Sequence, residues 1–141
     1  MTPALRVATW STTVAVSVTG LAYAWMRYCL SPANPMDLAN HPCQPTMQYL
    51  HVLAAPVWLV VFGVLWHAHA LPKLQSREAA RRRSGIALLV LSAAMAASGY
   101  LLQTSVEDWA RSLWSVTHVA TSLAWLLALA IHVLTQKPRA A

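Results

Sequence analysis

Acidic residues are scarce in this sequence. Asp and Glu together number four in 141 residues, and charged residues of both signs reach only 10%, whereas 57% of the chain is hydrophobic. A soluble domain carries about a quarter charged residues, so this composition excludes an ordinary soluble fold and suits a bilayer. The length supports one membrane domain, residues 1–141, without a separate soluble catalytic domain.

Positive charge, in contrast, is in excess. The chain has ten Lys and Arg residues and a net charge of +6 at pH 7, which raises the question of nucleic-acid binding. The basic residues stand in short segments between long apolar stretches, as they do in membrane proteins. We therefore expect no nucleic-acid partner.

Four apolar stretches of roughly 20 residues qualify as membrane spans, and none of them contains Asp or Glu. They predict an all-α fold, a four-helix transmembrane bundle with up-down-up-down topology. The seven tryptophans are expected mostly to anchor helix ends at the membrane interface. The predicted spans are residues 7–28, 47–70, 85–103 and 110–134.

Basic residues set the orientation of this bundle. They crowd the connection between the second and third spans and follow the fourth, so the positive-inside rule places both segments in the cytoplasm. Both termini are then cytoplasmic, and the other two connections face the periplasm of a bacterial inner membrane. The residues concerned are Lys73, Arg77, Arg81, Arg82, Arg83, Lys137 and Arg139.

The first span has an alternative interpretation, because residues 22–24 (AYA) resemble the small-residue cleavage site of a secretory signal. The apolar stretch is longer than a signal core, and a single arginine precedes it. We therefore expect the segment to be retained as a span.

Two short motifs suggest an internal repeat. Residues 18–21 (VTGL) in the first span parallel residues 97–100 (ASGY) in the third, and each motif precedes a histidine-bearing span. Two helical hairpins related by a pseudo-twofold axis explain the pattern. A chance match explains it too, since small residues commonly pack transmembrane helices together. Both explanations stay open at this point.

Histidines are concentrated in two of the spans. Ionisable residues inside a membrane are costly, so such a group indicates a function. The 14 residues from His118 to His132 turn a helix by about −40° and raise it about 21 Å, so both imidazoles face one side at different depths. The five intramembrane histidines are His51, His67 and His69 in the second span and His118 and His132 in the fourth.

The second ligand on the helix of His51 is either His69 or His67. His69 returns to about the azimuth of His51, whereas His67 falls on nearly the opposite face. The rise to His67, about 24 Å, matches the fourth helix better, and Pro56 is able to change the helical phase between them. We favour His69 on angle and keep His67 as the alternative.

Both histidine-bearing spans run from periplasm to cytoplasm, so His51 faces His118 at one depth and His69 or His67 faces His132 at the other. Two imidazole pairs stacked along the membrane normal are the arrangement that two transverse haem planes require. A zinc or copper permease would rather cluster its ligands with carboxylates or thiolates. Because no span offers an acid, we expect two non-covalent b-type haems with these histidines as iron ligands.

A porphyrin also needs space between helices and partners for its propionates. Gly20 and Gly99, toward the periplasmic ends of the histidine-free helices, are expected to give that space, with close helix packing as the alternative role. Gly63 is a further candidate nearer the inner haem. Arg27 and Arg111 are expected to bind propionates at the periplasmic face.

With these features the chain resembles the four-helix di-haem membrane cytochrome b superfamily. This superfamily includes cytochrome b561 proteins and the cytochrome b subunits of nickel-iron hydrogenases and formate dehydrogenases. The resemblance covers all four spans and rests on residues 98–102 (SGYLL) through His118 to His132, on residues 50–56 (LHVLAAP) and on residues 66–69 (WHAH). The first span has no histidine, whereas some members draw a ligand from it.

The resemblance implies electron exchange between the membrane quinone pool and a periplasmic redox partner, a cytochrome c or an oxidoreductase subunit. It places His51 and His118 on the periplasmic haem and His69 and His132 on the cytoplasmic one. Two other functions compete with this one: a haem-free anchor or assembly subunit of a respiratory complex, and a transition-metal permease. Whether the chain itself oxidises quinol or reduces quinone stays open.

The first periplasmic connection carries Cys29 and Cys43. They either form a disulfide, which an oxidising compartment permits, or stay independent thiols. His41 in the same connection is expected to be solvated. The chain lacks a Cys-x-x-Cys-His motif, so covalent haem attachment is not expected.

Overall fold

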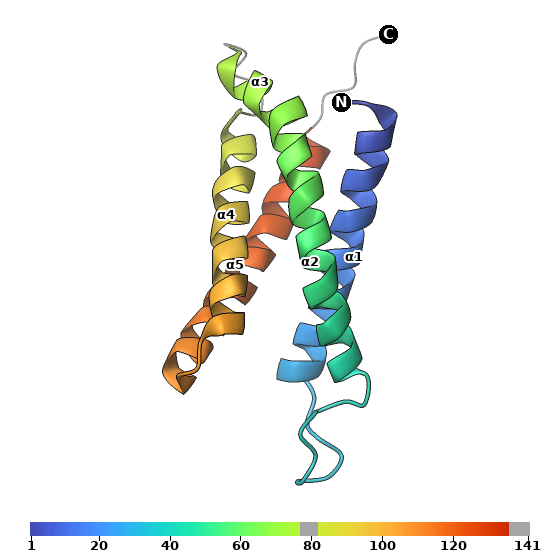
Figure 1. Ribbon diagram of the computed structural model, residues 1–141, viewed down its shortest axis with the longest axis vertical. Coiled ribbons are helices and arrows are strands. Elements are labelled where there is room, and N and C mark those ends of the chain that lie inside the picture. Colours follow the sequence, from blue (N-terminus) through green and yellow to red (C-terminus); the bar gives the residue numbers. More distant parts are fainter. Residues whose placement is uncertain (77–81, 136–141) are drawn as a thin grey trace. The chain divides into compact units, whose positions relative to one another are not determined.

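The computed structural model describes residues 1–76 and 82–135 (Figure 1). Over these residues every regular element is a helix, which confirms the predicted all-α fold. The chain forms two units, Met1–Gln75 and Ser76–Ala141. The first holds α1 (Pro3–Tyr28), α2 (Gln44–Leu65), the π-helix η1 (Trp66–Ala70) and α3 (Leu71–Gln75), and the second holds α4 (Arg82–Thr104) and α5 (Asp108–Leu134).

Three helices of the described residues are long and apolar enough to cross a bilayer. They are Gln44–Gln75, in which α2, η1 and α3 follow one another without a break, Arg82–Thr104 and Asp108–Leu134. Each contains one of the predicted spans, with a few residues added at one or both ends. The structure is therefore consistent with a multi-pass membrane protein.

The first predicted span lies in α1, which is not among these three helices. Serines and threonines recur along α1 and lower its hydropathy. Thr9, Thr12 and Thr19 each donate a hydroxyl hydrogen bond to the carbonyl oxygen four residues earlier, at 2.7–2.8 Å. Such bonds satisfy the hydroxyl groups inside the helix. The helix is thus confirmed, and its crossing of the membrane stays a prediction.

Within each unit two helices pack side by side as an antiparallel hairpin (Figure 1). We call α1 with α2 hairpin 1, and α4 with α5 hairpin 2. The loop 29–43 is tied to both helices of hairpin 1. The Asn40 side-chain amide donates to the carbonyl oxygen of Arg27 at 2.8 Å, and its main-chain N–H donates to the buried side chain of Gln44 at 3.0 Å. The connection in hairpin 2 is short, residues 105–107.

A buried tryptophan holds the two helices of each hairpin together. Trp58 of α2 is 4% exposed, and its Nε1–H donates to Thr13 Oγ1 of α1 at 3.1 Å. Trp125 of α5 is 6% exposed, and its Nε1–H donates to Ser92 Oγ of α4 at 2.8 Å. The expected role of interfacial anchor does not hold for these two side chains, which are the most buried large apolar groups of the described residues.

Apolar side chains cover much of the outer surface of the helices. Val60 of α2 and Val116 and Leu127 of α5 are each about two thirds exposed, at 69%, 67% and 64%. A monomeric soluble protein rarely leaves so much apolar surface in water, whereas lipid tails solvate such side chains as well as a protein core does. The bilayer is therefore the partner that this surface fits.

The basic residues that set the predicted orientation are only partly described. Lys73 of α3 and Arg82 and Arg83 at the start of α4 are exposed. The remaining four lie outside the described residues: Arg77, Arg81, Lys137 and Arg139.

We expect the bond between Trp58 and Thr13 to stabilise hairpin 1. Thr13→Val keeps the shape of the side chain but removes the hydroxyl acceptor, so stability should fall by roughly 0.6 kcal/mol, the average for interhelical hydrogen bonds in membranes. Thermal unfolding of the detergent-solubilised protein, followed by circular dichroism, measures the change. Thr12→Val is the matched control, because Thr12 donates within its own helix. Equal melting temperatures of the two variants would contradict the prediction.

Candidate functional site

His51 of α2 is held against α1 by a hydrogen bond to the main chain. Its Nδ1 lies 3.0 Å from the carbonyl oxygen of Val16 and 3.4 Å from Thr19 Oγ1. Because a carbonyl oxygen only accepts, Nδ1 carries a proton and donates it. In the neutral ring the lone pair then lies on Nε2. This contact fixes both the tautomer of the imidazole and the orientation of its ring.

Gly20 of α1 lies against the same imidazole. A Cβ at position 20 would stand 2.6 Å from Cε1 and 2.9 Å from Nδ1 of His51, closer than a real Cβ approaches another heavy atom. Only glycine lets the ring come so near the helix. We expected Gly20 to leave space for a porphyrin, and the group that the structure shows in that space is the histidine ring.

Hairpin 2 repeats this arrangement with other residues. The Nδ1 of His118 in α5 lies 3.0 Å from the carbonyl oxygen of Met95 and 3.4 Å from Ser98 Oγ. A Cβ on Gly99 would stand 2.9 Å from Cε1 and 3.1 Å from Nδ1 of this imidazole. His118 is thus fixed in the same tautomer as His51.

The similarity of the hairpins extends well beyond the motifs at 18–21 and 97–100. In both hairpins the hydroxyl residue follows the accepting carbonyl by three residues and the glycine follows it by four. In both, the buried tryptophan follows the histidine by seven residues and bonds a hydroxyl on the neighbouring helix. A chance match of small residues does not account for equal contacts at equal spacing, so the structure favours a true repeat of hairpins.

His132 of α5 has a different hydrogen-bond partner. Its Nδ1 lies 2.9 Å from Ser84 Oγ at the start of α4, and a Cβ on Gly85 would stand 3.8 Å from its Cε1, an ordinary contact. A hydroxyl either donates or accepts, so this contact positions the ring without fixing its tautomer. Neither Ser84 nor Gly85 was among the predicted site residues.

A sequence signal for this site was nevertheless present. A hydroxyl residue followed by glycine occurs at positions 19–20, 84–85 and 98–99, and in each case both residues contact one histidine. The spacing of the last two pairs, 14 residues, equals the spacing of His118 and His132. Because the two helices run antiparallel, equal spacings on both helices let Ser98 contact His118 and Ser84 contact His132.

In hairpin 1 the helix changes its winding where His67 and His69 stand. Residues 66–70 form η1 and contain both His67 and His69. We considered Pro56 as a place where the helical phase changes. Pro56 lies inside α2, which continues past it as an α-helix to Leu65, so the winding changes well beyond the proline. π turns are rare and often lie at functional sites.

Helical phase bears on the choice between the two histidines. Leu65 of hairpin 1 corresponds in position to His132 of hairpin 2, because Leu65 follows His51 by 14 residues and His132 follows His118 by 14 residues. At roughly 80° per residue in a π turn, or about 100° in an α turn, His69 returns to within about 40° of Leu65 and His67 falls on the opposite side. Both are exposed. Either winding agrees with His69 as the inner ligand, and the assignment stays a prediction.

The two arginines expected to bind propionates are exposed at the ends of their helices. Arg27 lies in the last turn of α1. The Nη1 of Arg111, in the first turns of α5, donates to the carbonyl oxygen of Ser105 at 3.4 Å. Propionate binding by these two arginines stays a prediction.

His41 has a local role at the start of α2. Its Nδ1 accepts the main-chain N–H of Cys43 at 3.1 Å, and its carbonyl oxygen accepts the N–H of Gln44 at 2.9 Å. Cys29 and Cys43 are free, exposed thiols. Of the two states that the sequence left open, the structure has the independent thiols.

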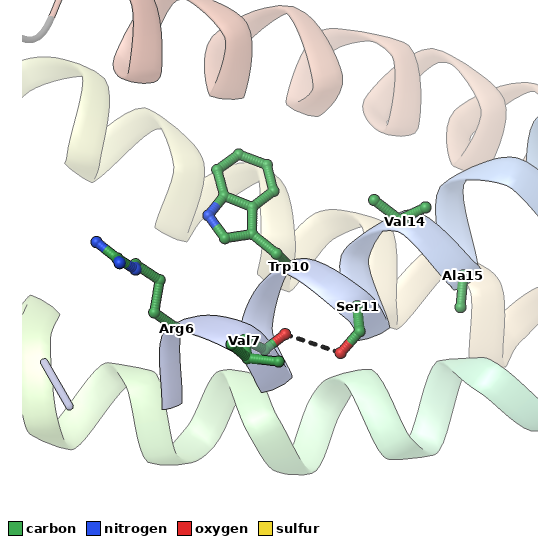
Figure 2. Close-up of a pocket in the computed structure, with 6 residues that line it drawn as sticks. All are labelled: Arg6, Val7, Trp10, Ser11, Val14 and Ala15. Carbon is green, nitrogen blue, oxygen red and sulfur yellow. Dashed lines mark hydrogen bonds between the residues drawn. The ribbon is translucent and has the colours of Figure 1, made fainter. Parts of the chain in front are cut away.

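Gly63 has open space beside it: apart from its own stretch of helix, no heavy atom of the described residues stands within 4 Å of a Cβ placed there. Within residues 1–76 and 82–135 no three His, Cys, Asp or Glu side chains gather as a metal site. Figure 2 shows a shallow hollow on α1 that contains none of the histidines; its lining is Arg6, Val7, Trp10, Ser11, Val14 and Ala15.

No protein-family model, curated protein or solved structure matches this chain. Membership of the di-haem cytochrome b superfamily therefore stays a prediction. The function has to be argued from the histidines and the groups that hold them.

We expect Gly20→Ala to displace the imidazole of His51 and Gly99→Ala to displace that of His118, because the added methyl group cannot share the space with the ring. Gly63→Ala is the control, since a methyl group meets nothing there. ¹⁵N NMR of histidine-labelled protein reports the protonated Nδ1 atoms directly. The resonances of His51 and His118 should each change in the corresponding variant and stay in the control. Unchanged resonances in all three would show that the rings do not depend on the glycines.

Proposed function

We propose that the chain carries electrons across a membrane on two b-type haems. His51 and His118 ligate the iron nearer the periplasm, and His69 and His132 the iron nearer the cytoplasm, with His67 as the alternative to His69. Electrons pass between the quinone pool and a periplasmic redox partner, a cytochrome c or an oxidoreductase subunit. The single observation that carries the proposal is the hydrogen bond from Nδ1 of each outer histidine to a main-chain carbonyl oxygen.

This bond prepares an imidazole for iron. Ligating histidines usually donate their other ring N–H to a carbonyl or carboxylate oxygen, which fixes the tautomer and raises the basicity of the ligating nitrogen. His51 and His118 both meet this condition with Nδ1, so Nε2 is the nitrogen with the lone pair. Both hairpins build the same arrangement, so His51 and His118 are equivalent as ligands.

The chemistry of the donor set also fits haem. A porphyrin already supplies four nitrogen ligands to iron, so two neutral imidazoles complete the coordination. Neither a carboxylate nor a thiolate is needed, and the predicted spans contain no acid. The bound haem supplies one-electron chemistry. This chain's part is to orient the two imidazoles, keep them neutral and exclude water with its apolar helices.

The remaining parts of the proposal come from the sequence. The pairing of His51 with His118 and of His69 with His132 follows from their depths in the spans. α1 serves as the fourth span, both termini are cytoplasmic, and the membrane is a bacterial inner membrane. Arg27 and Arg111 bind haem propionates near the periplasmic loops, as charge-assisted hydrogen bonds to carboxylates favour. Gly20 and Gly99 serve the haem through the histidines that they admit.

The first test is a dithionite-reduced minus oxidised spectrum of the purified protein, with a pyridine haemochrome assay of haem per chain. Two haem b per chain are expected. His118→Ala should remove one haem and leave the other, because His118 is proposed to ligate only one of the two irons. His41→Ala is the control and should keep both. Full haem content in His118→Ala would exclude the ligand assignment.

A second function is favoured by the same contacts. The bonds from His51 to Val16 and from His118 to Met95 also join helices without any cofactor, as in a haem-free anchor or assembly subunit of a respiratory complex. A colourless protein, purified from cells that supply haem to other cytochromes, would support this function. In that case His51→Ala lowers the melting temperature and has no spectrum to change.

Single substitutions decide which inner histidine is the ligand. We expect His69→Ala to lower the haem content from two to one per chain, and His67→Ala to leave it at two, because His67 lies on the opposite side of the π turn. The pyridine haemochrome assay on both variants measures this. The reverse result would assign His67, and a loss in both variants would indicate disturbed folding of η1.

A further inference from the structure

Two aromatic rings of hairpin 1 are stacked on one another. The centroids of Trp58 and Phe62 lie 5.0 Å apart, with 19° between the ring planes. Trp58 is buried, and its Nε1–H donates to Thr13 Oγ1 of α1. A buried, hydrogen-bonded indole has a defined orientation, and the ring of Phe62 stacks on it.

The pair lies between the outer and the inner histidines of the first unit. Trp58 follows His51 by seven residues, which puts it about 10.5 Å along the helix and within roughly 20° of the same face. Phe62 follows Trp58 by one turn, and a further turn leads to Trp66, the first residue of η1. Aromatic residues thus recur at every turn from the middle of α2 to the π turn that carries His69.

Hairpin 2 has the packing tryptophan but not the second ring. Trp125 follows His118 by seven residues, is equally buried and bonds Ser92 as Trp58 bonds Thr13. At the position that corresponds to Phe62, hairpin 2 has Leu129. Phe62 is also the only phenylalanine of the chain. Packing of a hairpin therefore does not require an aromatic residue at this position.

We propose that Trp58 and Phe62 form the electron path between the two haem sites, an inference that rests on the proposed function. With haem bound at both sites, a ferrous iron would supply the electron and a ferric iron would accept it, and the part of Trp58 and Phe62 would be to couple the two. No bond is made or broken, and no proton moves. Tunnelling is faster through closely packed π systems than through saturated side chains or gaps, because their orbitals lie nearer in energy to the tunnelling electron. The two rings act by coupling the sites and are not themselves oxidised.

The matched pair of tryptophans separates this role from packing. Trp58→Leu and Trp125→Leu remove equally buried indoles with equivalent hydrogen bonds, and Phe62→Leu gives hairpin 1 the residue that hairpin 2 already has. If the aromatic path operates, only the two substitutions in hairpin 1 slow the transfer. Trp58→Phe keeps a ring without the bond to Thr13, so it should restore much of the rate lost in Trp58→Leu.

The transfer rate is measured in the full chain by photoreduction. A ruthenium photosensitiser on Cys43, in a Cys29→Ser background, injects one electron on the loop side, and absorbance follows its redistribution between the haems. Haem content and midpoint potentials are measured first in each variant, so that changes of driving force are separated from changes of coupling. Near-ultraviolet circular dichroism of the haem-free protein reports the stacked pair, whose signal should be lost in Phe62→Leu and kept in Trp125→Leu.

We expect a severalfold slower transfer in Trp58→Leu and Phe62→Leu, at unchanged potentials, and the parent rate in Trp125→Leu. Equal slowing in Trp58→Leu and Trp125→Leu would overturn the aromatic path in favour of packing. A parent rate in Phe62→Leu would overturn it as well, even where Trp58→Leu does not fold. A parent protein without haem would instead overturn the proposed function itself, and the aromatic path with it.

Discussion

Both outer histidines depend on one interaction, an imidazole N–H on one helix that donates to a main-chain carbonyl oxygen on its neighbour. The oxygen of a helical carbonyl lies close to the helix axis, and side chains normally cover it. The imidazole reaches it only where the covering side chain is absent, which is why Gly20 and Gly99 stand four residues after the accepting carbonyls. The carbonyl, the glycine and the histidine therefore depend on one another and form a single structural motif.

Membrane energetics explain why such units are combined with small and hydroxyl residues. Lipid tails are as apolar as leucine, so burying apolar surface does not drive two helices together inside a bilayer. Close approach and interhelical hydrogen bonds have to do so. Trp58 with Thr13 and Trp125 with Ser92 supply both at the centre of each hairpin. The histidine bonds add a second contact about two turns away, and together they fix the register of each helix pair.

The sequence was sufficient for the all-helical fold, and it singled out His51 and His118, which the structure holds against neighbouring helices; their role toward a haem stays a prediction. Hydropathy located the helices, because length and apolar composition decide which segments cross a bilayer. Hydropathy did not settle whether α1 crosses the membrane. The threonines of α1 lower its hydropathy, although their hydroxyl groups form hydrogen bonds within the helix. The burial of Trp58 and Trp125 was also missed. A tryptophan by itself indicates the membrane–water interface, and only a hydrogen-bond partner on another helix shows that it is buried between helices. The π turn at 66–70 has no simple sequence signal that periodicity detects.

The two ends of the hairpins are not equivalent. At the outer end both imidazoles bond a carbonyl, which fixes them as Nδ1 donors. At the inner end His132 bonds the hydroxyl of Ser84, which fixes no tautomer, and the position of hairpin 1 that corresponds to His132 is Leu65. The inner histidines of hairpin 1 lie beyond it on a π turn. Hydrogen bonding to the ligand tunes a haem, so under the proposed function the two sites are unequal. A difference in midpoint potential between the two haems would follow.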